Sequence, residues 1–161
     1  MTTLLHPGDK FPRIDLALVG GKTLTLPDAF AGRFGVVLFN RGSWCPFCTG
    51  QLRAFQRAAD KLDALGVSVA SVSVDDEATA RELINKHHLT FPVGHSADAG
   101  AIHDATGAFV NDNPVFLQAT GFVLDPAGDV IISVYSSGAI GRLMPDDVVG
   151  LINYVNSTHA A

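Results

Sequence analysis

The two cysteines of this chain, Cys45 and Cys48, constrain its fold and chemistry more than any other feature of the sequence. They follow a short apolar run, Gly35 to Phe39, and stand directly before a segment with helical periodicity. We therefore expect a buried strand that delivers two thiols to the start of a helix. The free N–H groups and the dipole of a helix start favour negative charge, and the thiolate is the reactive form of cysteine.

The segment after the cysteines predicts one amphipathic helix that ends near Gly66. Its apolar side chains recur at steps of three and four, and Cys48 begins the stripe that they form. The members of this stripe are Cys48, Leu52, Phe55, Ala59 and Leu62. Gln51 falls on another face of the helix, where it either orients the cysteine loop or is solvated.

The rest of the chain alternates between strand and helix patterns. We expect a hairpin joining residues 16–19 to 22–26, strands at 36–39 and 67–74, an extended piece at 89–93 and a hairpin over 121–135. Helices are expected at 77–88, 99–105 and 145–156, and Asp75-Asp76 are expected to cap the first of these. Residues 107–118 show a turn signal but no clear element. This order implies an α/β fold with a mixed sheet and helices on both faces.

The length and charge of the chain limit its class. A chain of 161 residues fits one domain, expected to span 1–161, and can bury a sizeable core. Its net charge of −5, without a basic block, argues against nucleic acid or an anionic membrane as partner. The sequence has no apolar run near the ~20 residues that span a bilayer, and its start lacks a signal-peptide pattern. We expect a cytosolic protein.

The motifs resemble those of the peroxiredoxin (AhpC/TSA) family within the thioredoxin superfamily. The Trp44-Cys45-Pro46-Phe47-Cys48 motif is similar to that of a peroxiredoxin-like branch with a Trp-Cys-Pro-aromatic-Cys sequence. Four later segments match the family in order and spacing, and the resemblance covers residues 7–156. These segments are residues 71–75, 89–93, 96–98 and 122–128. The resemblance implies a thioredoxin fold of the peroxiredoxin type, with an N-terminal β-hairpin.

The sequence departs from the typical family pattern at three supporting positions. Where the family has a proline and a threonine before its peroxide-attacking cysteine, this chain has Arg41 and Cys45. The distant family arginine is replaced by Ala119. Thioredoxins place a cis-proline beside their disulfide, and that place here falls on Thr120.

The resemblance implies that Cys48 attacks a hydroperoxide and that Cys45 resolves the sulfenic acid into a disulfide. Arg41, Trp44 and Thr120 are the expected substrate-binding residues, although Arg41 could equally be a surface cation. An external thiol such as thioredoxin or glutathione would restore both cysteines, and family members commonly form dimers. One alternative is a disulfide reductase in which Cys45 attacks first. Another is a binding module whose cysteines act only as a redox switch.

We expect neither a cofactor nor a metal site. Two cysteines and two histidines can bind zinc, but the usual His-x₃₋₅-His spacing is absent. His87 and His88 are adjacent at a predicted helix end, where histidine complements the helix dipole.

Overall fold

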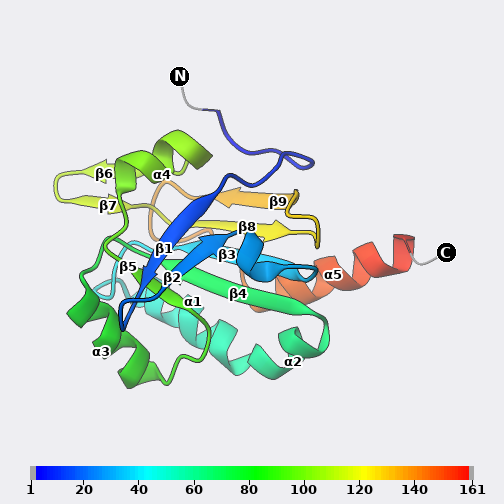
Figure 1. Ribbon diagram of the computed structural model, residues 1–161, viewed down its shortest axis with the longest axis horizontal. Helices are drawn as coiled ribbons and strands as arrows, with labels where there is room; N and C mark the ends of the chain where they lie inside the picture. Colours follow the sequence, from blue (N-terminus) through cyan, green and yellow to red (C-terminus); the bar gives the residue numbers. More distant parts are fainter. Residues whose placement is uncertain (1–2, 160–161) are drawn as a thin grey trace.

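The computed structural model describes residues 3–159, so the outermost two residues at each end of the expected domain lie outside it. A seven-stranded mixed sheet forms its centre, in the order β2-β1-β5-β4-β3-β8-β9 (Figure 1). The strands are β1 (Ile14–Leu18), β2 (Thr23–Leu26), β3 (Phe34–Phe39), β4 (Val67–Val72), β5 (Val93–His95), β8 (Thr120–Leu124) and β9 (Val130–Tyr135). A separate hairpin consists of β6 (Val110–Asp112) and β7 (Val115–Leu117).

The cysteine-bearing strand β3 lies inside the sheet, parallel to β4 and antiparallel to β8. Its side chains alternate between two cores. Val36 and Leu38 pack into one, while Val37 and Phe39 pack into the other. A strand buried on both faces needs apolar side chains on both, which explains the unbroken apolar run in the sequence. The predicted thioredoxin fold of the peroxiredoxin type, including its N-terminal β1-β2 hairpin, is confirmed.

Helices cover both faces of the sheet. The elements are η1 (Asp28–Phe30), α1 (Pro46–Arg57), α2 (Ala59–Ala64), α3 (Glu77–His87), α4 (Ala99–Thr106) and α5 (Pro145–His159). In Figure 1, α1, α2 and α3 lie below the sheet, and α4 lies above it with the β6-β7 hairpin. Phe55 of α1 and Ile152 of α5 share one core, whereas Ile102 of α4 belongs to the other. None of the helices in the described part of the chain is long and apolar enough to cross a membrane.

Three expectations differ from the structure. The single helix expected up to Gly66 is two helices, because the chain turns at Ala58 while the apolar spacing continues into α2. The extended piece expected at residues 89–93 forms a strand only from Val93 onward. Pro92 has no N–H to give to a sheet, so the ladder with β4 begins after it. The segment 107–118, which showed no clear element, contains the β6-β7 hairpin.

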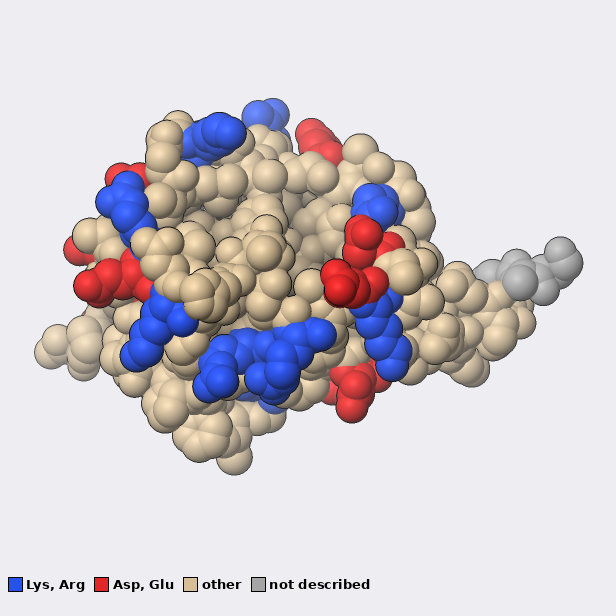
Figure 2. Space-filling view, turned by 90° about the horizontal axis from the view of Figure 1, so that it is seen from below, with Lys and Arg blue, Asp and Glu red and all other residues tan. Residues whose placement is uncertain are grey.

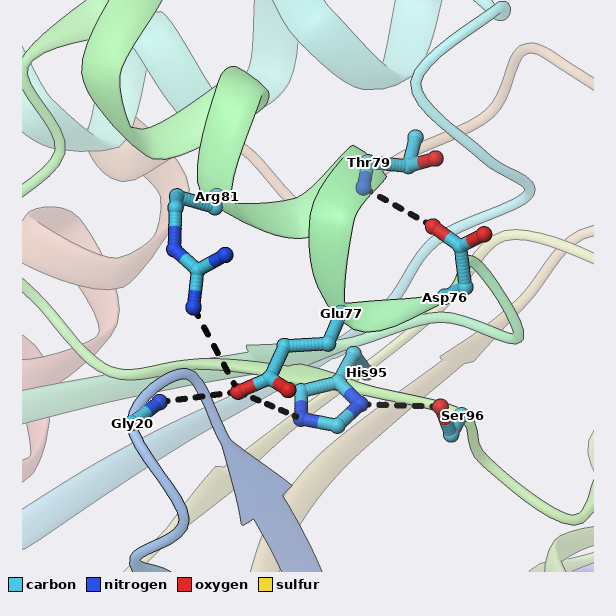
Figure 3. A network of polar contacts seen from close by, with 7 residues as sticks. All are labelled: Gly20, Asp76, Glu77, Thr79, Arg81, His95 and Ser96. Carbon is cyan, nitrogen blue, oxygen red and sulfur yellow. Dashed lines mark hydrogen bonds and ion pairs between the residues drawn. The ribbon is translucent and has the colours of Figure 1, made fainter.

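The start of α3 is fixed by hydrogen bonds and ion pairs (Figure 3). Asp76 caps this helix, as expected, because its Oδ1 accepts a hydrogen bond from Thr79 N at 2.8 Å. Glu77 Oε2 accepts from Gly20 N at 2.9 Å and lies 3.9 Å from His95 Nε2. These contacts connect the tip of the β1-β2 hairpin to α3 and β5.

Candidate active site

The two cysteines lie where β3 passes into α1. Cys45 is the N-cap residue of α1, Pro46 begins the helix, and Cys48 lies in its first turn. Proline suits this position because the first helical N–H has no partner within the helix. Both cysteines are free thiols, and their exposed fractions are 0% and 1%. The disulfide-reductase alternative, in which Cys45 attacks first, would need an exposed Cys45, and the structure shows it buried. Substrate contact with either sulfur therefore requires movement of the groups that cover it.

One arginine contacts both sulfur atoms. Arg142 Nη2 donates to Cys48 Sγ at 3.0 Å and lies 3.7 Å from Cys45 Sγ. The backbone N–H of Arg41 donates to Cys48 Sγ at 3.2 Å. The guanidinium of Arg142 is a planar cation with several N–H donors, so this pair of thiols faces a positive charge. These donors act against the cost of burying a negative charge at either sulfur.

Arg142 is held in place by α1 and by its own loop. Its Nη1 donates to Gln51 Oε1 at 2.9 Å, and its Nε donates to Ala139 O at 2.5 Å. Gln51 Nε2 in turn donates to Leu143 O at 2.7 Å. Gln51 is only 4% exposed, so the idea that it is solvated is wrong, and its hydrogen bonds hold Arg142 and Leu143 rather than the cysteine loop.

Arg41 turns toward the cysteines from the loop after β3. Its Nε donates to Gln118 Oε1 at 3.0 Å, and its Nη1 donates to Cys45 Sγ at 3.6 Å. The guanidinium carbon lies 5.0 Å from the ring centre of Trp44 and 5.1 Å from that of Phe116. Both distances are typical of cation–π contacts. Arg41 is therefore part of the site and not a free surface cation.

The other expected binding residues differ in exposure. Trp44 is 56% exposed and meets Phe116 edge to face, with ring centres 5.0 Å apart. Thr120 is buried in β8 opposite Phe39, and its hydroxyl donates to Gln118 O at 3.0 Å. A role in substrate binding stays a prediction for both residues.

The pKa values of the two thiols move in opposite directions. Burial opposes ionisation of Cys45, but hydrogen bonds from Cys48, Arg41 and the Phe47 backbone outweigh it and lower the pKa of Cys45. Burial dominates at Cys48 and raises its pKa, although the charge of Arg142 and backbone N–H groups act against this. Since the thiols interact, they titrate as a pair, with the first negative charge favoured on Cys45.

Two residues of the site were missed from the sequence. Arg142 and Gln118 lie outside the cysteine motif, in segments without a regular pattern. No sequence signal distinguishes them from ordinary surface side chains. Of the described residues, no group of three or more His, Cys, Asp or Glu side chains comes together in a way that could hold a metal ion.

A Cys-x-x-Cys pair at the amino end of a helix, after a central strand of a mixed sheet, defines a thiol oxidoreductase of the thioredoxin fold. Comparison with known families makes this more specific. The sequence model of the AhpC/TSA family matches residues 7–132. The chain belongs to this family, that of the peroxiredoxin thiol peroxidases.

Individual relatives agree with this assignment. The peroxiredoxin of Methanothermobacter thermautotrophicus is 30% identical over 149 residues, which cover 88% of this chain and 69% of the relative. That of Thermotoga maritima is 28% identical over 141 residues, covering 84% and 65%. The chain thus spans about two thirds of these relatives. The structure of Mycobacterium tuberculosis AhpC is similar in fold, with a TM-score of 0.80 at 24% identity, over 99% of this chain and 97% of that one.

Proposed function

We propose that this protein reduces hydroperoxides at Cys48 and that Cys45 then closes an intramolecular disulfide. One observation supports this most directly: the guanidinium of Arg142 contacts Cys48 Sγ at 3.0 Å. Peroxide reduction needs a thiolate, together with donors that stabilise the departing oxygen. Arg142, and the Arg41 N–H at 3.2 Å, provide such donors although the usual family threonine and arginine are replaced.

The reaction proceeds in two steps. The Cys48 thiolate attacks one peroxide oxygen, the O–O bond breaks, and the alkoxide leaves as an alcohol after taking up a proton. Cys48 is then a sulfenic acid, and the Cys45 thiolate attacks its sulfur. The S–O bond breaks, the hydroxide takes up a proton and leaves as water, and the disulfide forms. Two electrons from an external thiol, such as thioredoxin or glutathione, restore the pair.

The substrate-binding roles follow from what surrounds the sulfurs. Arg41 and Trp44, which are stacked on each other, would line the entry to the thiols, and Thr120 would border it from β8. The working form carries a reduced dithiol, which fits a reducing compartment such as the cytosol. A homodimer is part of the same proposal, by analogy with the family.

A second candidate function is reduction of disulfides with Cys45 as the attacking thiol. The observation that favours it is the position of Cys45 as N-cap residue, where hydrogen bonds lower its pKa below the ordinary value. A thiol that ionises first is the better attacker at neutral pH. A non-catalytic redox switch would need no such stabilised thiolate.

One comparison separates these candidates. Hydroperoxide consumption and insulin-disulfide reduction are measured on the native protein, on Cys45→Ser and on Cys48→Ser. Peroxidase chemistry at Cys48 requires that Cys48→Ser abolish peroxide consumption and that Cys45→Ser still form a trappable sulfenic acid. Loss of insulin reduction mainly in Cys45→Ser supports the disulfide reductase. Reaction of neither thiol faster than free cysteine would leave only the switch.

A further inference from the structure

A pocket of about 330 Å³ lies between β1, β5 and α4. It is on the α4 side of the sheet, whereas the patch of Lys and Arg side chains in Figure 2 is on the opposite side, below the sheet. The floor of the pocket consists of apolar side chains that also belong to the core on the α4 side: Ile14, Leu16, Val72 and Ile102. The volume is within the range of sites that bind small molecules. The proposed peroxide chemistry gives this pocket no role.

A serine and a histidine line the same pocket and contact each other. Ser96 Oγ lies 2.8 Å from His95 Nδ1, and the other ring nitrogen, Nε2, lies 3.9 Å from Glu77 Oε2 (Figure 3). A carboxylate beside Nε2 favours the tautomer that carries its proton on Nε2, which leaves Nδ1 free to accept the proton of Ser96. A hydroxyl, a base and a carboxylate in this sequence of contacts are the groups that activate a serine for nucleophilic attack.

The carboxylate of this group is held in place by two further contacts. Glu77 Oε2 accepts from Gly20 N at 2.9 Å and lies 3.7 Å from Arg81 Nη2. The side chain of His95 is only 12% exposed, so its ring is held between its neighbours. Contacts such as the 3.9 Å separation from Glu77 commonly shorten during the reaction, when the base becomes charged. Glu77 can therefore stabilise the imidazolium that forms when His95 takes up a proton.

The backbone at Ser96 has a strained conformation that its surroundings impose. Its φ is 55°, in the left-handed region, which is uncommon for residues other than glycine. Hydrogen bonds fix the chain on both sides, since Ser96 N donates to Asp75 O at 2.6 Å and Ala97 N donates to Ser73 O at 3.1 Å. Strain that is fixed in this way is concentrated at functional sites. The Ser96 side chain is also exposed, so a substrate can reach it without a rearrangement.

We propose that Ser96 and His95 form a second catalytic site, which hydrolyses neutral esters with a short apolar acyl chain. Ser96 is the nucleophile and His95 the general base, while Glu77 is a positioning residue because it acts through His95. The acyl chain would lie on the apolar floor of the pocket. The amino end of α4, which begins three residues after Ser96, has the nearest helix N–H groups along the chain for the oxyanion.

The rim of the pocket supports a neutral substrate. Arg13 and Asp15 both line it, but they pair with each other, with Arg13 Nε 3.8 Å from Asp15 Oδ1. Asp98 also lines it and adds a negative charge. An anionic acyl group would meet this charge beside an apolar floor, where burial of its own charge is costly.

The reaction balances without an oxidant or a reductant. Ser96 Oγ attacks the carbonyl carbon of the ester while His95 Nδ1 takes the hydroxyl proton. The bond to the alcohol oxygen breaks, and the alcohol leaves with the proton from His95. Water then gives a proton to His95 and attacks the acyl group on Ser96. The bond between the acyl carbon and Ser96 Oγ breaks, Ser96 regains its proton, and a carboxylic acid leaves.

The test measures hydrolysis of p-nitrophenyl butyrate by the native chain and by Cys45→Ser/Cys48→Ser, in which no thiol can be acylated by the ester. Four further changes are made in this cysteine-free background: Ser96→Gly, His95→Gln, Glu77→Gln and, as a matched loss of an exposed hydroxyl on α5, Ser157→Ala. Glycine adopts a positive φ freely, so Ser96→Gly removes the hydroxyl without adding strain. A fluorophosphonate probe, located by mass spectrometry, identifies the reactive serine.

We expect the cysteine-free chain to hydrolyse the ester and the probe to label Ser96. Ser96→Gly and His95→Gln should each lower the rate about 100-fold or more, because a positioned base contributes about 10²–10⁴-fold. Glu77→Gln should lower kcat about tenfold and leave KM unchanged, which a general disturbance of the pocket would not do. Ser157→Ala should keep the full rate.

Hydrolysis that requires the cysteines, or that persists in Ser96→Gly, would overturn the proposal, as would labelling of a serine other than Ser96. A chain that shows no hydrolysis above the buffer would do the same. Peroxide consumption with dithiothreitol as donor, measured on Ser96→Gly with both cysteines intact, should equal that of the native chain. This last measurement shows that the variant is folded, and it tests the proposed peroxidase function separately.

Discussion

Arg142 Nη2 lies 3.0 Å from Cys48 Sγ although 94 positions separate the two residues in the chain. The contact exists because the loop between β9 and α5 returns to the amino end of α1. Gln51 holds this loop in position, because its side-chain amide donates to Leu143 O and accepts from Arg142 Nη1. The arginine beside the thiol thus lies in the loop before α5, and not at position 119, where the family pattern places its distant arginine.

Replacing Arg142 by glutamine should slow peroxide consumption by roughly 10- to 100-fold. A hydrogen bond to a charged group contributes about 1.5–3 kcal/mol, and each 1.4 kcal/mol changes a rate about tenfold. The measurement is the initial rate with hydrogen peroxide and dithiothreitol. Arg13→Gln, which removes an exposed cation paired with Asp15, serves as control and should leave the rate unchanged. Equal rates in Arg142→Gln and the native protein would show that this contact has no role in the chemistry.

Replacing Arg41 by glutamine should move the ionisation of Cys45 to higher pH. The hydrogen bond from Arg41 favours the thiolate, so its loss raises the pKa of Cys45 from its lowered value. The ultraviolet absorbance of the thiolate, titrated on the reduced protein, gives the midpoint of the first step. Arg81→Gln, on α3, removes one charge without touching either sulfur and should not move it. A midpoint that moves to lower pH would contradict the assigned role of Arg41.

Gly42→Ala should displace Trp44. A Cβ at position 42 would overlap the indole ring, which at present lies over Arg41 and beside Phe116. Because Trp44 is the single tryptophan, its emission should shift to longer wavelength as the ring loses these neighbours. Gly50→Ala is the control, since a Cβ there meets nothing. Identical spectra for Gly42→Ala and the native protein would show that the indole does not occupy this position.

Phe122→Ala should lower the free energy of unfolding by about 3–5 kcal/mol, the usual cost of removing a buried phenyl ring. Phe122 is fully buried and meets Phe11, Phe39 and Tyr135 edge to face. Urea denaturation followed by circular dichroism measures the change. Ile132→Ala, on the exposed side of β9, should cost far less. Similar losses in both variants would mean that Phe122 is not a central core residue.

Several elements were predictable because a local pattern specified each of them. Val36 to Phe39 is apolar on both faces, as a strand between two neighbours must be. Asp76 precedes Thr79 by three positions, the spacing at which an N-cap side chain reaches a free N–H. The interruption of the helix at Ala58 was missed because the apolar spacing of α1 continues through it.

By itself, the sequence determined that two thiols follow a buried strand and begin a helix, because periodicity and spacing along the chain are local properties. Only the tertiary structure decided what surrounds those thiols. Arg142 and Gln118 come from segments that are distant in sequence, yet Arg142 contacts Cys48 and Gln118 holds Arg41 beside Cys45. The sheet order and the loop before α5 bring these segments together, and no pattern along the chain records such a meeting.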